Sequence, residues 1–159
     1  MLTQRIVLLL AAAWTGTLWT IGYVVAPTLF ATLDDRRLAG TIAGTLFRIE
    51  GIVSVVAGVL LLALANSLVQ RARSRGGRAL YRSLRWPLLG MVLCTLIGYF
   101  ALDPFMAMLR EKAAAEGLAV GASRHATQFG ILHGVSSLFY LVESLLGVLL
   151  IWRLAGRGR

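Results

Sequence analysis

The chain has 159 residues, of which 58% are hydrophobic and only 14% are charged. Soluble domains contain roughly 25% charged residues, and the mean hydropathy of this chain is +0.77. These values exclude an ordinary soluble domain. Several membrane-spanning helices within these 159 residues would leave no room among them for a separate catalytic domain of typical size.

Four long, nearly uncharged stretches predict four transmembrane helices, because a helix needs about 20 apolar residues to cross about 30 Å of hydrocarbon. The predicted spans cover residues 6–29, 46–68, 84–102 and 126–152. Short connections between them favour an all-α, up-down four-helix bundle embedded in the membrane. The first stretch is too long for the apolar region of a signal peptide, so we expect an uncleaved span.

The distribution of the arginines predicts the orientation of the bundle. Residues 71–85 contain six arginines and no acid, whereas the connections on the other side mix basic and acidic residues. The positive-inside rule therefore places both termini and this connection in the cytoplasm. Although the net charge is +9, we expect these arginines to contact anionic lipid headgroups and not nucleic acid. They are Arg71, Arg73, Arg75, Arg78, Arg82 and Arg85.

The connection between the third and fourth spans predicts a short helix of its own. Asp103 is expected to cap a helix over residues 104–116, with Pro104 in its first turn and Gly117 after its end. Apolar side chains recur on one face of this segment, so we expect an amphipathic helix on the outer surface of the membrane.

The fourth span carries a polar face. At 100° per residue, its polar side chains fall within an arc of about 120°, which must avoid lipid by facing other helices or water. These side chains are His133, Ser136, Ser137, Tyr140, Glu143 and Ser144.

Helix depth predicts partners for this face. Glu50 of the second span and His133 lie at similar depths in the outer half, so we expect them to form a buried polar pair, with Arg48 as a further member. Glu143 has no basic residue at its depth and is expected to be protonated or held by hydroxyl groups. The candidate hydroxyls are those of Thr15, Thr17 and Thr95.

Small residues predict where helices pack closely. They are Gly130 and Gly134 on the fourth span and Ser54 and Gly58 on the second, and Pro27 is expected to close or kink the first span.

The inventory of reactive side chains argues against catalysis and cofactors. The histidines, His125 and His133, lie about 80° apart on one helix, which excludes a bis-histidine haem site within one chain. Cys94 is the single cysteine, and no catalytic motif is present. We therefore expect no enzyme activity, no metal and no cofactor.

Three short segments resemble the transmembrane protein 205-like family, small four-span proteins catalogued as a domain of unknown function. They are Gly22-Tyr-Val-Val-Ala-Pro27-Thr-Leu-Phe30, Gly40-Thr-Ile-Ala-Gly44-Thr-Leu-Phe47 and Phe129-Gly-Ile-Leu-His133-Gly134-Val-Ser136-Ser137. The resemblance implies a four-helix membrane fold and emphasises Pro27, His133, Gly134 and Ser136. Where the family usually has asparagine, this chain has Tyr140.

These observations favour a non-enzymatic binding or accessory module, with a polar cluster between the second and fourth spans. The fifteen arginines against one lysine indicate a GC-rich bacterial genome, and hence the inner membrane. Two alternatives stay open. One is an oligomeric transporter or permeation unit, in which the glycine-lined faces contact other copies or a membrane-protein partner. Eukaryotic members of the resembling family are linked to drug resistance and secretion, which favours transport. The other is a haem or metal carrier that uses His133.

Overall fold

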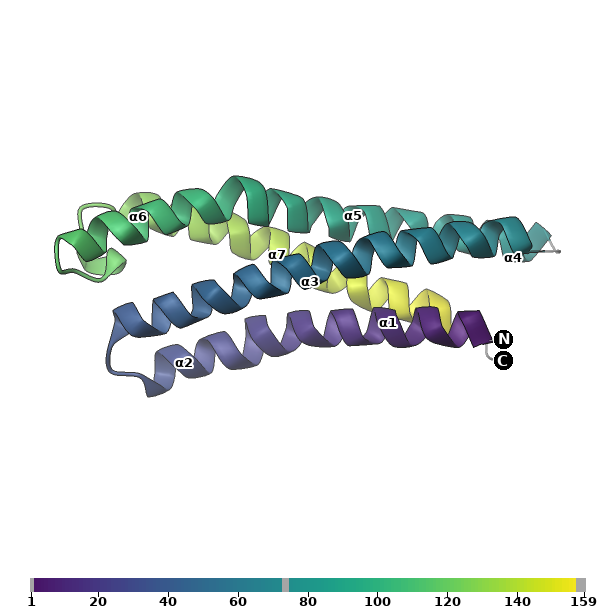
Figure 1. Cartoon of the computed structure of the whole chain (residues 1–159), viewed down its shortest axis with the longest axis horizontal. Coiled ribbons are helices and arrows are strands. Elements are labelled where there is room, and N and C mark those ends of the chain that lie inside the picture. The colour runs from purple at the N-terminus through teal and green to yellow at the C-terminus, as the bar shows by residue number, and fades with distance from the viewer. Residues whose placement is uncertain (1, 73–74, 157–159) are drawn as a thin grey trace.

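The computed structural model describes residues 2–72 and 75–156, and all secondary structure within these ranges is helical (Figure 1). The helices form four long rods that lie side by side. Each rod is long and apolar enough to cross a membrane, which agrees with the four predicted spans. The rods are Gln4–Thr32, Arg36–Arg71, Gly76–Ala115 and Ala126–Ala155.

The first rod contains a wide turn before its proline. It consists of α1 (Leu2–Trp19), the π-helical segment η1 (Thr20–Val25) and α2 (Ala26–Thr32), with Pro27 in the first turn of α2. Proline lacks an N–H and crowds the carbonyl one turn earlier, and a π turn widens the backbone enough to accommodate both effects. The helix therefore continues past Pro27 to Thr32 and is not closed there.

The second rod is the single helix α3 (Arg36–Arg71). It begins ten residues earlier than the predicted span, because Asp35 caps it: the Asp35 carboxylate accepts from the backbone N–H groups of Arg37 at 2.8 Å and Leu38 at 3.2 Å. The connection between the first two rods is correspondingly short.

The third rod repeats the arrangement of the first. It contains α4 (Arg75–Ser83), α5 (Arg85–Leu96), the π-helical segment η2 (Ile97–Leu102) and α6 (Asp103–Ala115).

The predicted helix over residues 104–116 is present as α6, but it is not separate from the third span. It continues the third rod through η2, with Pro104 in its first turn as Pro27 is in the first turn of α2. The apolar face of α6 is buried within the bundle at Met106, Leu109 and Ala113. The helix ends as predicted beside Gly117, which has a φ of 75°.

The fourth rod is α7 (Ala126–Ala155), preceded by the short 3₁₀ turn η3 (Val120–Ala122). Each rod packs against its sequence neighbours, and α7 also packs against α1, which closes an up-down bundle. The two ends of the chain lie together at the end that carries α4, opposite α2 and α6 (Figure 1).

The half of the bundle near the termini is tightly packed. Gly58 lies against Val92 and Trp14, and a Cβ atom at this position would overlap the valine side chain. Gly58 thus lies at a close helix contact, as predicted. The largest fully buried side chains of this inner half are Trp14, Leu18, Leu61, Leu84, Leu88, Met91 and Leu150.

Candidate functional site

The half of the bundle away from the termini, here called the outer half, holds a cavity of about 850 Å³. Its walls come from the second parts of the first and third rods and from the first parts of α3 and α7. Its lining includes the glycines Gly22, Gly40, Gly44, Gly51, Gly98 and Gly121. Tyr140, Arg110 and Tyr99 occupy the side-chain positions at Gly22, Gly44 and Gly51, whereas the positions at Gly40, Gly98 and Gly121 are open.

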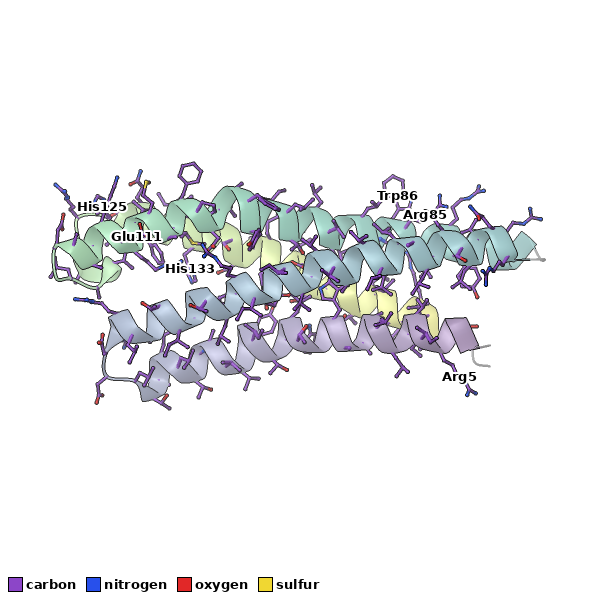
Figure 2. All side chains as sticks on the ribbon, in the orientation of Figure 1. Arg5, Arg85, Trp86, Glu111, His125 and His133 are labelled. Carbon is purple, nitrogen blue, oxygen red and sulfur yellow. The ribbon has the colours of Figure 1, made fainter. Side chains whose placement is uncertain are left out.

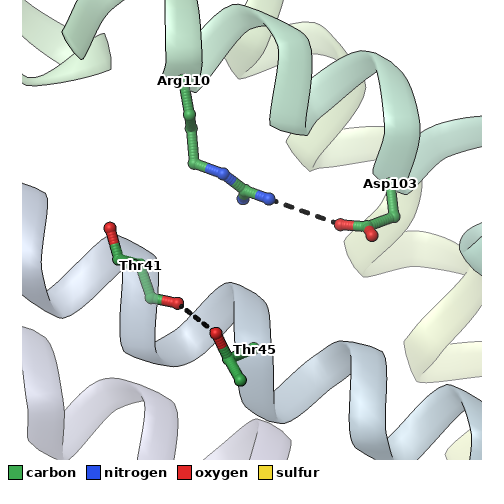
Figure 3. Close-up of polar contacts among 4 residues, drawn as sticks. All are labelled: Thr41, Thr45, Asp103 and Arg110. Carbon is green, nitrogen blue, oxygen red and sulfur yellow. Dashed lines mark hydrogen bonds and ion pairs between the residues drawn. The ribbon is translucent and has the colours of Figure 1, made fainter.

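The outer end of the cavity is bounded by charged side chains and by residues 119–122, which include η3. Arg110 reaches from α6 toward α3 and pairs with Asp103, with 3.4 Å between Nη2 and Oδ1 (Figure 3). Its guanidinium carbon lies 6.0 Å from the centroid of the Phe129 ring on α7, and a Cβ atom at Gly44 of α3 would lie 3.1 Å from its Nη2 atom. Arg110 therefore spans the mouth between three rods.

The pair of Arg110 and Asp103 was not predicted to be part of the site. A usable signal was present, because residues seven apart on a helix share a face.

Glu50 lies at the inner end of the cavity and is 5% exposed. Its Oε1 atom accepts a hydrogen bond from the Ser54 hydroxyl one turn further along α3. The Ser54 hydroxyl in turn accepts from Nε1 of Trp14 at 2.6 Å. This chain of hydrogen bonds fixes the carboxyl of Glu50 to the packed core.

Glu143 of α7 also lines the inner end and is 4% exposed. Thr95 of α5 donates to its Oε1 atom at 2.7 Å, which confirms one of the three hydroxyls predicted for this role. Thr17 instead donates to the carbonyl of Trp14, and the Thr15 hydroxyl, buried against Gly147, has no hydrogen-bond partner.

The two buried carboxyls, those of Glu50 and Glu143, lack a partner of opposite charge in the described chain. Within the part of the chain that the structure describes, neither Glu50 nor Glu143 forms an ion pair, and the Oε2 atom of each accepts no hydrogen bond. Both nevertheless border a cavity with largely apolar walls.

Aromatic side chains form much of these walls. The ring of Tyr140 packs edge-on against Tyr23, with centroids 6.0 Å apart, and against Phe47, with centroids 5.5 Å apart. Its hydroxyl donates to the carbonyl oxygen of Leu18 at 2.6 Å, and its ring fills the place of a side chain at Gly22. Tyr99, on η2, also lines the cavity, and its ring lies against Gly51 of α3.

His133 lies on the wall of the cavity, in the half of the molecule away from the termini (Figure 2). Its ring stacks on Phe129 one turn earlier, with centroids 5.9 Å apart and an angle of 6° between the rings. No hydrogen bond or ion pair joins His133 to Glu50 in the described residues, so the predicted direct pair is wrong; the hydrogen-bonding partner of Glu50 is Ser54, on its own helix. Arg48 is exposed and does not line the cavity.

The remaining predicted cluster residues lie where the helical count places them. Ser136 and Ser137 line the cavity together with Tyr140 and Glu143. Ser137 and His133 are exposed, and not buried as predicted, because the helices that should cover them are separated by the cavity.

The predicted packing residues divide into two groups. Ser54 is buried where α3 meets α1, through its hydrogen bond with Trp14. Gly130 and Gly134 contact no other helix, since a Cβ atom at either position would meet nothing within 4 Å. The prediction that these two glycines pack against another helix is therefore wrong within the described chain. Pro27, the remaining predicted packing residue, is exposed and lines the cavity.

The arginine-rich connection lies at the end of the bundle that carries the termini. Arg5 and Arg85 lie near this end, whereas Glu111 and His125 lie at the other (Figure 2). Arg85 donates to the side-chain oxygen of Asn66. Arg71, Arg78 and Arg82 are exposed, while Arg73 and the side chain of Arg75 lie outside the described residues.

No three His, Cys, Asp or Glu side chains in the described ranges are grouped as metal ligands. The free thiol of Cys94 is buried beside the cavity.

The model of one protein family, described as Domain of unknown function (DUF4149), matches residues 9–115 of the chain. No curated protein and no solved structure matches the chain significantly.

Proposed function

Because the chain belongs to the DUF4149 family of domains of unknown function, and four of its helices are long and apolar enough to cross a membrane, we propose that it is a non-enzymatic membrane protein that binds a small lipophilic molecule. The cavity of about 850 Å³ carries this proposal. Small-molecule sites have volumes of roughly 300–1,000 Å³ and mostly apolar walls with a few fixed polar groups.

The hydrogen bonds of the site support binding over catalysis. Glu50 and Glu143 are held by Ser54 and Thr95 at their Oε1 atoms, which orients them without activating a nucleophile. His133 stacks on Phe129 and forms no hydrogen bond with a nucleophilic side chain in the described residues.

We place the protein in the bacterial inner membrane, with the termini and α4 in the cytoplasm. The positive-inside rule supports this orientation, as does the position of the arginine-rich connection beside the termini (Figure 1). The cytoplasmic arginines then contact anionic lipid headgroups. At 1.5 Å per residue, α3 is about 54 Å long, so the mouth of the cavity reaches the outer headgroup region.

Cysteine labelling in intact cells tests this orientation. In a Cys94→Ala background, Glu111→Cys is expected to react with a membrane-impermeant maleimide, and Arg78→Cys only after the membrane is opened. The reverse pattern contradicts the proposed orientation.

The transmembrane protein 205-like assignment belongs to the same proposal. Two of the three resembling segments, Gly22–Phe30 and Gly40–Phe47, fall within the residues that match the family model. Gly130 and Gly134 lie on a surface that this chain leaves uncovered, so we also propose that α7 contacts a second copy or a membrane partner.

A blocking substitution tests small-molecule binding. Gly98 lines the cavity and has open space where its side chain would lie, so Gly98→Leu is expected to fill part of the site. Gly16→Leu is the matched control, because Gly16 is also surrounded by open space but lies outside the cavity. Mass spectrometry of molecules that co-purify from membranes should find a compound with the wild type and Gly16→Leu that is lost from Gly98→Leu. Identical sets from all three proteins contradict the proposal.

Transport is a second candidate function. The cavity occupies only the outer half, while the packed core from Trp14 to Leu150 closes the inner half, as in one state of an alternating-access carrier. Flux of the co-purifying compound into proteoliposomes is then expected, and it should fall in Glu143→Gln and His133→Ala. No flux, or flux unchanged in both variants, contradicts transport.

A further inference from the structure

The chemistry of the inner end of the cavity specifies what kind of molecule fits. Two carboxyls, each more than nine-tenths buried, border one apolar space. Ionised carboxylates in such surroundings need a partner of opposite charge, because burial away from water strongly disfavours an isolated charge.

The described chain supplies no such partner. The arginines at the cavity, Arg36 and Arg110, lie at its outer end, and Arg110 is already paired with Asp103. His133 on the cavity wall forms no ion pair with either carboxyl in the described residues. The hydroxyls of Ser54 and Thr95 bond the Oε1 atoms only. The Oε2 atoms of Glu50 and Glu143 thus remain free to accept hydrogen bonds from a ligand.

The walls beside the carboxyls match a cation that carries an apolar body. Tyr23, Phe47, Tyr99 and Tyr140 line the cavity, and aromatic faces attract ammonium groups as well as hydrocarbon. A hydrated metal ion has no apolar surface to pack against the aromatic walls. The grouped side chains that a metal needs as ligands also do not occur in the described ranges.

We infer that the cavity binds a lipophilic organic amine, whose ammonium group lies at Glu50 and Glu143 and whose apolar body packs among the aromatic rings. This inference rests on the proposed function and adds the chemical class of the ligand. The ammonium donates to the free Oε2 atoms; its charge balances that of one ionised carboxylate, and the other carboxyl carries a proton and accepts as a neutral group.

Three adamantane derivatives of nearly equal size test the inference: 1-adamantylammonium, 1-adamantanol and 1-adamantanecarboxylate. Titration calorimetry on the full chain in phosphatidylcholine nanodiscs is expected to show that the ammonium compound binds at least about tenfold more tightly than the alcohol, since hydrogen bonds to charged groups contribute about 1.5–3 kcal/mol. The carboxylate should bind most weakly.

Matched variants locate the recognition. Glu50→Gln and Glu143→Gln keep the size of each side chain and its bond to the neighbouring hydroxyl, so each should reduce binding of the ammonium compound about tenfold and leave that of the alcohol unchanged. Glu111→Gln is the control, because Glu111 is exposed on α6 and outside the cavity. Unchanged thermal unfolding verifies that the variants are folded.

Several outcomes overturn the inference. Equal affinity of the ammonium and the alcohol means that the carboxyls act as neutral hydrogen-bonding groups, and preference for the carboxylate places recognition at Arg36. Absence of binding by all three compounds also rejects it. The comparison of Gly98→Leu with Gly16→Leu uses co-purifying molecules and decides the proposed function independently of these results.

Discussion

Thr95 on α5 joins Glu143 on α7 by a hydrogen bond of 2.7 Å at the inner end of the cavity. The same hydroxyl oxygen lies 3.1 Å from the carbonyl oxygen of Met91. A threonine hydroxyl has one hydrogen, so when it donates to Met91, its contact with Glu143 requires the carboxyl to donate. Whether Thr95 or Glu143 donates the hydrogen bond between them therefore depends on whether Glu143 is ionised.

Thr95→Val should destabilise the protein by about 1–3 kcal/mol, because it removes the partner of a buried carboxyl without changing the side-chain shape. Thermal unfolding in micelles measures the effect. Thr28→Val is the control, since Thr28 is exposed and bonds only its own helix. Equal losses in both variants would show that the bond between α5 and α7 contributes no stability of its own.

Ser54→Ala should cost more stability than Trp14→Phe. The serine accepts from Trp14 and donates to Glu50, so its removal leaves two buried polar groups unpaired, at about 1–3 kcal/mol each. Trp14→Phe leaves the bond to Glu50 intact and loses mainly packing volume. Chemical unfolding of both variants gives the comparison, and a larger loss for Trp14→Phe contradicts the prediction.

Gly147→Ala should destabilise the protein by about 1–3 kcal/mol through overpacking. The added Cβ atom would lie 2.6 Å from Thr15 Oγ1 and 2.9 Å from Thr15 Cγ2. Thr15→Ala removes both atoms and loses no hydrogen bond, because the hydroxyl has no partner.

A double-mutant cycle therefore checks this contact. Gly147→Ala combined with Thr15→Ala should be more stable than the sum of the two single changes predicts. Additive effects would show that the two positions do not meet.

Arg110→Gln should open the mouth of the cavity at little cost. Its pair with Asp103 is partly exposed, with 27% and 18% of the side chains accessible, and such pairs contribute about 0–1 kcal/mol. Cys94 beside the cavity should then react several-fold faster with 2-aminoethyl methanethiosulfonate, because a positive charge that repels the reagent is gone. Lys112→Gln removes the same charge from the exposed side of α6 and should leave the rate unchanged.

The sequence was sufficient to predict the four apolar rods and the polar face of α7. Both depend on hydropathy and helical period, which are local properties of the chain. Glu143 is accordingly buried and held by one of the predicted hydroxyls.

The cavity was not predictable in the same way. Whether His133 is covered or exposed depends on the spacing between helices that are far apart in the sequence, and the helical period of α7 alone carries no information about that spacing. Depth along the helices placed Glu50 and His133 at one level, but Ser54, a neighbour on the same helix, provides the closer partner for Glu50.

The two π-helical segments were also missed, and they changed the helix boundaries most. Pro27 and Pro104 indicated a kink or a helix start, yet the widened turns η1 and η2 carry both helices onward. A helical wheel drawn through either segment therefore assigns the residues beyond it to the wrong face.

Each π-helical segment rotates the faces of the helix that follows it relative to the faces of the helix that precedes it. Lengthening or shortening α2 or α6 beyond its proline would leave Trp14, Leu61 and Leu150 in place, because Trp14 precedes η1 on its rod, and Leu61 and Leu150 lie on helices without a π-helical segment. The tightly packed half and the half that holds the cavity can consequently be redesigned separately.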